Sequence, residues 1–368
     1  MKGLFIVFHG FAAHNGISKK IFYQCDALRR CGAELRLCSL EVGADGSHRR
    51  ILDGETLENF GHGLRAKLKK RFSYRSVTDY IRREGVRFLY VRFDHNANPA
   101  LIRWFAHLKK LGVRIVMEIP TFPYDPEYAR ASRKTKLVLS VDKCFRNALA
   151  RQVDRIVTFS QYDTIFGRPT IRISNGIDFA HIPLKTNVND TSNTVHLLGV
   201  ADIHFWHGFD RLVRGLADYY RNNPEYKVYF HIVGPLSGER ERAGILPVVR
   251  DNHLEPYVLL HGPLHGDELD AMFEKADFAI GSLGRHRSGI TYIKTLKNRE
   301  YAARGFAFTY SETDDDFDHM PYVWKVAPDE SPVDIQGLID FRKTLKMTPL
   351  PRYANRSARY RGRRKCRK

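Results

Sequence analysis

Short apolar runs alternate with amphipathic segments along the first half of the chain. The runs are rich in β-branched and aromatic residues and end at polar or glycine-containing stretches, which predicts β-strands. The segments between them repeat apolar residues every three or four positions, which predicts helices. This alternation indicates a parallel sheet covered by helices. The expected strands lie at 3–10, 33–40, 86–93, 113–120 and 154–160, and the expected helices at 18–32, 99–112 and 143–153.

The same alternation starts again after the polar, turn-rich stretch 174–194. It predicts an α/β chain with two Rossmann-like domains, at 1–176 and 195–345, joined by a linker at 177–194. Ligands of open α/β sheets bind at the carboxyl ends of the strands, so a cleft between two such sheets is the expected site. The expected strands of this half lie at 194–200, 227–234, 257–263, 277–283 and 306–311, and the expected helices at 208–224, 239–252, 266–276 and 292–304, the last capped by Gly305.

The length and composition fit a globular protein with two cores. The chain has 368 residues, of which 43% are hydrophobic and 27% are charged. No run reaches the ~18 apolar residues needed to cross a bilayer, and "MKGLFIVFHG" is typical of a strand and not of a signal peptide. A cytoplasmic protein is therefore expected. No GxGxxG follows the first strand and the cysteines lack CxxC spacing, which disfavours a dinucleotide cofactor and a structural zinc site.

The net charge of +19 is distributed unevenly along the chain. Residues 1–176 carry +16, residues 177–351 carry −6 and residues 352–368 carry +9. A basic half implies a surface presented to an anionic partner, such as phospholipid, nucleic acid or a phosphorylated acceptor. Within this half, "RAKLKKRFSYR" at 65–75 predicts contact with an anionic membrane surface or an acceptor diphosphate. The basic tail at 346–368 is expected to be disordered.

The stretch "LKNREYAARG" (296–305) places Lys297 and Glu300 on one face of a predicted helix that leads into a strand. Taken alone, the two residues predict a solvent-exposed ion pair, which contributes about 0.3 kcal/mol. In the alternative interpretation, the ammonium binds an anion and the carboxylate accepts hydrogen bonds from vicinal sugar hydroxyls. The other motifs of the chain favour this second interpretation.

Five motifs of the second half occur in a specific order: "SNGID", "HGFDRL", "IVG", "LHGPLHGDELDAMFEKAD" and "LKNREYAARGFAF". This order resembles that of the two-Rossmann (GT-B) glycosyltransferases, and among them the retaining family four that builds bacterial surface polysaccharides. In the first half, "NGISKKIFYQCDALRRCGAELRL" resembles the glycine loop and first helix of that family. "RIVMEIPTFPYDPEY" and "RIVTFSQYDTIFG" resemble a capsular or lipopolysaccharide subgroup. The resemblance covers roughly residues 1–340.

The resemblance implies roles for individual residues. In that family, the glutamate at the position of Glu300 binds the ribose hydroxyls of a nucleotide-sugar. Lys297 and Arg211 then become candidates for the donor diphosphate, and Gly16 for a close approach of backbone to it. Glu118 stands where many relatives carry a histidine near the reacting sugar. We therefore expect Glu118 to be catalytic, orienting the acceptor or accepting its proton.

The chain departs from the family pattern at three positions. Tyr292 stands where the family has a carboxylate, and Asp202 and His207 stand where it has basic residues that bind phosphate. Other basic residues are expected to replace them at the donor site, and the alternative is a donor site that has lost its function. The candidates are Arg211, Arg287 and Lys294.

Metal and base recognition complete the predicted site. "DIHFWH" (202–207) spaces its histidines i,i+3, which does not match a helical zinc pair. "TDDDFD" (313–318) contains a D-x-D, yet a solvated acidic loop is the more favoured interpretation. We therefore predict a metal-independent protein with no cofactor. Base recognition is expected from backbone near Gly262–Leu264, which makes Leu264 a possible base contact.

The leading hypothesis is a glycosyltransferase that moves a sugar from a nucleotide-diphosphate donor to a hydroxyl of a lipid-linked or oligosaccharide acceptor. By resemblance it retains the anomeric configuration and works peripherally at the inner face of the cell membrane. A nucleic-acid-binding protein on the same scaffold is disfavoured because no helix-turn-helix or RNA-recognition motif is present. Two further alternatives are a catalytically lapsed protein that binds glycan or nucleotide-sugar, and a nucleotide-sugar epimerase.

Overall fold

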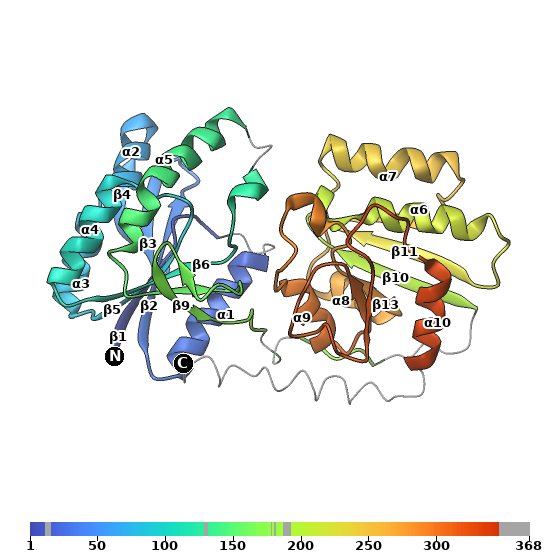
Figure 1. Cartoon of the computed structure of the whole chain (residues 1–368). Helices are drawn as coiled ribbons and strands as arrows, with labels where there is room; N and C mark the ends of the chain where they lie inside the picture. Colours follow the sequence, from blue (N-terminus) through green and yellow to red (C-terminus); the bar gives the residue numbers. More distant parts are fainter. Residues whose placement is uncertain (12–15, 129–131, 178, 180–181, 187–192, 346–368) are drawn as a thin grey trace. The chain divides into compact units, whose positions relative to one another are not determined.

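A computed structural model describes the chain except for residues 12–15, 129–131, 178, 180–181, 187–192 and 346–368. The chain divides into two compact units, and the division along the sequence falls between Gly176 and Ile177 (Figure 1). We call residues 1–176 unit 1 and residues 177–345 unit 2. Each unit has its own mainly parallel sheet flanked by helices, which confirms the predicted α/β class. The predicted tail at 346–368 and most of the second half of the predicted linker lie outside the described residues.

The sheet of unit 1 has nine strands in the order β4-β3-β2-β1-β5-β6-β7-β9-β8. The strands from β2 through β1 and β5 to β9 are parallel, whereas β3, β4 and β8 join as antiparallel strands at the two edges. The strands are β1 (Lys2–Ile6), β2 (Glu34–Val42), β3 (His48–Leu52), β4 (Glu55–Gly61), β5 (Phe88–Arg92), β6 (Arg114–Ile119), β7 (Arg155–Thr158), β8 (Thr164–Ile165) and β9 (Arg168–Arg172).

The apolar run of β1 is continuous because both faces of this sheet are covered. Leu4 and Ile6 pack into one core, and the alternating Phe5 and Val7 pack into another on the opposite face. In Figure 1, α4 and α5 lie on one side of the sheet and α1 on the other. The helices of unit 1 are α1 (Gly16–Arg30), α2 (Gly63–Phe72), α3 (Arg75–Glu84), α4 (Pro99–Lys110) and α5 (Arg133–Ala150), with a short 3₁₀ turn η1 (Asp125–Tyr128).

The antiparallel hairpin β3–β4 was not predicted, although the sequence contains a recognisable turn signal for it. Asp53 and Gly54 connect the two strands and have φ values of 45° and 92°. Two consecutive residues at positive φ match the tight hairpin turn for which Asp-Gly is a preferred sequence. The predicted alternation of strands and helices did not include this Asp-Gly turn.

The sheet of unit 2 has six strands, all parallel, in the order β12-β11-β10-β13-β14-β15. Figure 1 shows α6 and α7 side by side along one face of this sheet. The strands are β10 (Thr194–Val200), β11 (Lys227–Val233), β12 (Val258–Gly262), β13 (Phe278–Ile280), β14 (Phe308–Tyr310) and β15 (Val323–Lys325). The helices are α6 (Phe209–Tyr220), α7 (Glu239–Asp251), α8 (Gly266–Lys275), α9 (Leu296–Ala303) and α10 (Ile335–Leu345), with 3₁₀ turns η3 (Phe205–His207) and η4 (Arg285–Ser288).

Helix α9 is shorter than the predicted helix 292–304. It begins after Thr295, whose hydroxyl accepts the backbone N–H of Asn298, and its C-cap is Arg304, with Gly305 following at φ 83°. Residues 292–294 are held outside the helix because Tyr292 and Lys294 bind the acidic segment 314–316. The helix therefore starts one turn later than the periodicity predicts.

Strand β10 marks the point where the strand order of unit 2 reverses. The chain first adds β11 and β12 on one side of β10, and then adds β13, β14 and β15 on the other side. The chain therefore leaves β10 toward β11 and leaves β13 toward β14, in opposite directions along the sheet. The carboxyl edge at such a point is where open α/β sheets bind ligands. We look for the functional site of unit 2 at this edge.

Candidate functional site

Three loops meet at the carboxyl edge of the unit 2 sheet. The backbone N–H of Leu283, after β13, donates to the carbonyl of His207, after β10, at 2.8 Å. The N–H of Ser311, after β14, donates to the carbonyl of Ser282 at 2.9 Å. These bonds fix the loops relative to one another and to the sheet.

The loops after β10 and β13 also approach closely at Gly208. This residue has φ 64°, and a Cβ placed on it would lie 2.6 Å from the backbone nitrogen of Gly284. Both the left-handed backbone conformation and the close contact require glycine. The glycine of "HGFDRL" is therefore explained by the assembly of this edge.

Buried polar atoms without a partner gather at the same edge. They include the ammonium nitrogen of Lys297 and both carboxylate oxygens of Glu312, for which the described part of the chain supplies no hydrogen bond. Native proteins satisfy most buried polar groups, so such a cluster indicates that its partners come from outside the chain. The other members are the hydroxyls of Ser282 and Thr309 and the side-chain amide of Asn298.

The pKa values of Lys297 and Glu312 in this cluster lie near neutral pH. Burial and nearby Arg285 lower the pKa of Lys297, Glu312 opposes them, and the resulting pKa is about 7. Burial raises the pKa of Glu312, Arg285, its own backbone N–H and Lys297 oppose the rise, Asp314 adds to it, and the resulting pKa is about 7. The pKa of His207 is well below its usual value, because of burial and then the positive charges of Lys297 and Arg285. An anion that enters this edge would stabilise the charged form of Lys297.

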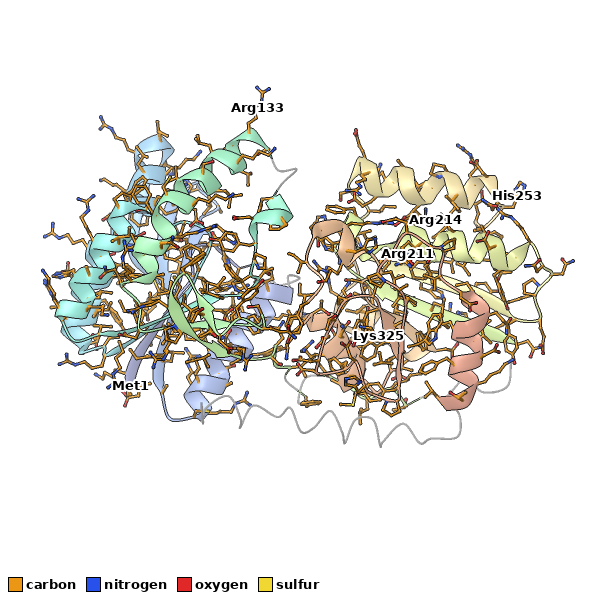
Figure 2. All side chains as sticks on the ribbon, in the orientation of Figure 1. Met1, Arg133, Arg211, Arg214, His253 and Lys325 are labelled. Atoms are coloured by element: carbon orange, nitrogen blue, oxygen red, sulfur yellow. The ribbon has the colours of Figure 1, made fainter. Side chains whose placement is uncertain are left out.

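Arg211 and Arg287 are saturated by the chain itself. Arg211 is buried in unit 2 (Figure 2), where it donates to the carbonyls of Leu283, Ala327 and Ser331 and forms an ion pair with Asp329. Arg287 holds the carboxylate of Asp210 with two bonds of 2.8 Å and also pairs with Glu330. Arg287 further donates to the carbonyl of Phe205 at 2.9 Å. Both guanidinium groups thus brace the loops of the site.

Lys294 and the acidic segment form a network of their own. The ammonium of Lys294 lies 2.5 Å from a carboxylate oxygen of Asp315 and 3.1 Å from one of Asp316. Asp314 is fully buried against Arg299, at 2.6 Å. The prediction of a solvated acidic loop is therefore wrong at Asp314, because the buried guanidinium draws its carboxylate inside. The three carboxylates lie within 4.8 Å of one another, and the cationic groups of Lys294 and Arg299 already bind them.

Lys297 and Glu300 do not pair with each other. Glu300 is 34% exposed and forms an i,i+4 ion pair with Arg304 at 3.0 Å. The ammonium of Lys297 instead points into the buried cluster, 6.0 Å from the ring centre of Phe209. The surface ion pair that the sequence allowed is thus not formed.

Leu264 is partly buried and packs against the core of unit 2.

Glu118 of unit 1 sits inside a full set of donors. Its carboxylate is 0% exposed and lies 3.4 Å from the ammonium of Lys20. It also accepts hydrogen bonds from Tyr90 and Gln24, each at 2.7 Å, and from Arg92. Burial alone would raise the pKa of Glu118, but Lys20, Arg92 and the two hydrogen bonds lower it to about 2. A carboxylate that holds its proton so weakly is a poor acceptor for a hydroxyl proton at neutral pH.

Gly16 is the first residue of α1, directly after the segment 12–15 that lies outside the described residues. A Cβ at Gly16 would meet no atom of the chain within 4 Å. The packing of unit 1 therefore does not require glycine here, and its predicted contact with a donor stays a prediction.

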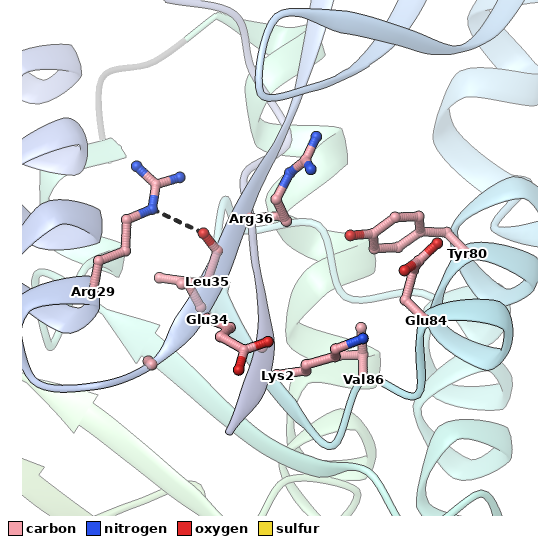
Figure 3. A pocket seen from close by; sticks show the side chains of 10 residues that line it. Lys2, Arg29, Glu34, Leu35, Arg36, Tyr80, Glu84 and Val86 are labelled. Carbon is pink, nitrogen blue, oxygen red and sulfur yellow. Dashed lines mark hydrogen bonds between the residues drawn. The ribbon is translucent and has the colours of Figure 1, made fainter.

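Two cavities lie in different environments. One, of about 320 Å³, opens at the amino ends of β1 and β2, between Lys2, Glu34 and Tyr80 (Figure 3), and Arg29 closes one side by donating to the carbonyl of Leu35 at 2.8 Å. It lies at the edge of the sheet that open α/β proteins do not use for ligands. The other, of about 430 Å³, lies along the loop after β10, between Phe205 and Arg240. This second cavity belongs to the candidate edge of unit 2.

Sequence reasoning missed Glu312 and Asn298. The structure places both residues at the candidate site. Glu312 comes two residues after the buried strand β14, and Asn298 faces Gly281, which follows β13. The available signal was positional: polar residues just beyond a buried parallel strand lie at the ligand-binding edge. The sequence interpretation of this region considered only the adjacent aspartates at 314–316 and not Glu312.

Comparisons with known proteins identify the fold. No family model and no curated protein matches the chain. Sucrose-phosphate synthase from Thermosynechococcus elongatus matches with a TM-score of 0.64 and 14% identity, covering 100% of this chain and 94% of that one. Anabaena HepE in complex with UDP gives 0.62 and 16%, and the catalytic domain of Arabidopsis thaliana starch synthase IV, bound to ADP and acarbose, gives 0.61 and 12%; each covers 98% of this chain and 94% of its own. At these identities the likeness concerns the fold, and it confirms the predicted GT-B class.

Proposed function

We propose that this protein is a glycosyltransferase that takes a sugar from a nucleotide-diphosphate donor. The observation that carries the proposal is the unpartnered ammonium of Lys297, buried at the carboxyl edge of the unit 2 sheet, where the strand order reverses beside β10. A buried cation at this crevice fits an anionic ligand, and the structurally similar proteins include one in complex with UDP and one bound to ADP. Donors based on these two nucleotides are the first to test.

The chemistry asks little of the protein beyond binding and charge neutralisation. When the sugar leaves, negative charge develops on the diphosphate, and a preorganised cation stabilises that charge in the transition state. We assign this role to Lys297. Glu300, partly exposed on α9, keeps its predicted role of accepting hydrogen bonds from ribose hydroxyls. We infer that transfer retains the anomeric configuration and needs no metal, as the resemblance implies.

The other predicted donor residues act in this proposal by position. Arg211 fixes the carbonyl of Leu283, and Arg287 fixes the carbonyl of Phe205, so the two arginines hold the loops on both sides of the crevice. Lys294 holds the acidic segment that follows β14. Glu118 positions Lys20 and Arg92 within unit 1. Gly16 and Leu264 keep their predicted donor contacts.

We further propose that the acceptor is a lipid-linked glycan and that unit 1 binds an anionic membrane surface. Leu64, Leu68 and Phe72 are 73%, 50% and 45% exposed, and their spacing of four residues places them along one stripe of α2. Basic residues surround the stripe at 65, 67 and 69–71. An exposed apolar stripe among cations is the pattern of a helix that lies in a membrane interface. No described helix is long and apolar enough to span a bilayer.

The donor site is tested by thermal unfolding of the purified protein with UDP-, ADP-, GDP- and CMP-sugars. A ligand at 100 times its Kd adds about 2.7 kcal/mol of stability. Stabilisation by one nucleotide class, lost in Lys297→Met and Glu300→Ala, supports the site. Stabilisation of the wild type without any sugar transfer would favour a lapsed nucleotide-sugar-binding protein, which the departures at Tyr292, Asp202 and His207 also allow. No response to any donor would contradict the proposal.

The membrane surface is tested by cosedimentation with phosphatidylcholine vesicles, with and without phosphatidylglycerol. We expect binding only to the anionic vesicles, weakened by salt, and lost when Leu64, Leu68 and Phe72 are replaced by Ser. The matched control replaces Leu246 and Leu260, which are 40% and 47% exposed in unit 2, by Ser. Equal loss of binding in the control, or binding that ignores phosphatidylglycerol, would contradict the assignment to α2.

A further inference from the structure

We propose that Glu312 recognises hydroxyl groups of the sugar that is transferred, next to the diphosphate held by Lys297. The inference rests on the proposed function and deepens it, because it separates the residue that binds the sugar from the residue that binds the nucleotide diphosphate. Glu312 belongs to none of the motifs that suggested a donor site. Its position and its lack of partners carry the argument.

The backbone around Glu312 is fixed on both sides. The N–H of Ser311 donates to the carbonyl of Ser282, and the N–H of Thr313 donates to the carbonyl of Thr291 at 2.7 Å. The carbonyl of Glu312 itself accepts a hydrogen bond from the ammonium of Lys325. The backbone that carries the Glu312 side chain is therefore fixed by the chain.

Glu312 is 1% exposed, and its carboxylate oxygens accept no hydrogen bond from any other described residue. Cations are available close by, since Asp314 binds Arg299 and Asp316 binds Arg299 and Lys294. The chain thus pairs the buried aspartate two residues further on and leaves Glu312 unpaired. A buried carboxylate without donors is costly, so a ligand that donates to it gains affinity.

The neighbours of Glu312 define the ligand. Lys297 is near enough for the two charges to affect each other, yet no ion pair joins them within the part of the chain that the structure describes. An ammonium and a carboxylate that are near each other and unpaired match a molecule with an anionic group next to hydroxyl donors. A sugar attached to a diphosphate has these two features adjacent. Ser282, Asn298 and Thr309 add unpartnered polar groups that fit further hydroxyls.

The experiment compares a sugar-nucleotide with the same nucleotide lacking the sugar. Calorimetry measures Kd for UDP-glucose and UDP, and for ADP-glucose and ADP, in the wild type and in Glu312→Gln. We expect Glu312→Gln to weaken binding of the sugar-nucleotide about tenfold or more while the affinity for the bare diphosphate is unchanged, because a hydrogen bond to a charged group contributes about this much. The ratio of the two constants is the readout, which cancels any general effect on folding.

Three variants serve as controls. Lys297→Met should weaken both members of each pair, because it removes the proposed diphosphate contact. Asp315→Asn removes an exposed carboxylate three residues further on and should change neither. Glu312→Asp keeps the charge but shortens the side chain, and supplies a second variant if Glu312→Gln does not fold.

The outcomes separate the two proposals. If the wild type binds both members of a pair and Glu312→Gln leaves their ratio unchanged, the role of Glu312 is wrong while the donor site stands. If Glu312→Gln weakens both members equally, Glu312 does not recognise the sugar. If the wild type binds none of the four ligands and no nucleotide-sugar of the thermal unfolding panel stabilises it, the proposed function fails and this inference fails with it.

Discussion

Two buried glutamates occupy comparable places in the two units and have opposite surroundings. Glu118 lies in β6 and Glu312 directly follows β14, and both carboxylates are at most 1% exposed. Glu118 accepts hydrogen bonds from four side chains and its pKa falls to about 2. Glu312 accepts none from any other described residue, and its pKa rises to about 7. Burial is common to both, so the donors around each carboxylate make the difference.

This difference indicates that the Glu118 carboxylate stabilises the fold, whereas the Glu312 carboxylate is available to bind a ligand. The saturated network of Glu118 keeps two cations inside unit 1, and its loss would remove the carboxylate that both of them bind. Glu312 has a fixed backbone and an unsatisfied side chain, so it weakens the folded state unless something binds it. Functional sites commonly hold such perturbed groups at a cost in stability.

The largest effect is expected for Glu118→Gln. Removing this charge leaves Lys20 and Arg92 buried without their anion, which costs about 3–5 kcal/mol of unfolding free energy. Urea unfolding at pH 7 measures it. The pKa of Glu118 lies below its ordinary value of 4.5, so its contribution is present above that pH and is lost as the pH falls toward 2. A variant as stable as the wild type at pH 7 would show that the network does not hold unit 1 together.

Glu312→Gln is expected to act in the opposite direction. The pKa of Glu312 is raised from 4.5 to about 7, so the wild type loses stability as the pH rises through this window and the loss is complete above it. The variant should therefore be more stable at pH 8.5 by up to about 3 kcal/mol, at about 1.4 kcal/mol per unit of pKa. At pH 4.5 the difference should vanish. Urea unfolding at both pH values, without ligand, makes the measurement, and a destabilised variant at pH 8.5 would show that Glu312 has a partner.

Lys297→Met tests the other side of the same site. Binding of a sugar-nucleotide requires the ammonium form, and the pKa of Lys297 in the free protein is about 7. Through this group, affinity should therefore fall about fivefold as the pH rises from 7 to 8, and Lys297 should take up protons on binding in this range. Calorimetry of UDP-glucose or ADP-glucose in buffers of different ionisation enthalpy measures the uptake. Lys297→Met should bind more weakly and without this pH dependence; an unchanged pH dependence would assign the proton to another group.

The smallest effect is expected at the exposed end of the acidic segment. Asp315→Asn removes one contact to Lys294 and the bond from Tyr292, yet Asp315 is 54% exposed, so the cost should be within about 1 kcal/mol. Asp314→Asn, at a fully buried carboxylate, should cost more. Thermal unfolding with MnCl2 and with EDTA should give the same Tm, because Lys294 and Arg299 already bind these carboxylates. A rise in Tm with manganese, abolished in Asp315→Asn, would contradict the prediction of a metal-independent site.

Much of the fold could be predicted because local patterns encode it. The continuous apolar run of Leu4, Phe5, Ile6 and Val7 already indicates a strand buried on both faces. The structure places these residues alternately in two cores. The helix of "LKNREYAARG" was predicted, but its start was not. Tyr292 and Lys294 were assigned to it from periodicity, whereas contacts to aspartates about twenty residues further on keep them outside α9.

The sequence suggested donor residues, but it did not indicate which of them have partners within the chain. Lys297 was assigned to the donor diphosphate from the resemblance in motif order; its ammonium has no hydrogen-bond partner among the described residues, and its contact with a donor stays a prediction. Arg211 and Arg287 were equally basic and equally close to motifs, yet they bind carbonyls and carboxylates of the chain. Glu312 carried no motif at all.

The sequence by itself determined the alternation of strands and helices, the two α/β units and the glycine at 208. These depend on side chains two to four positions apart and on backbone conformations that only some residues adopt. The tertiary structure alone decided which charges are neutralised and which remain open. Arg211 meets Asp329 across 118 residues, whereas Lys297 and Glu312, 15 residues apart, come near each other without pairing. Pairing depends on distance in the folded chain, and a charge can function in binding only where folding has left it without a partner.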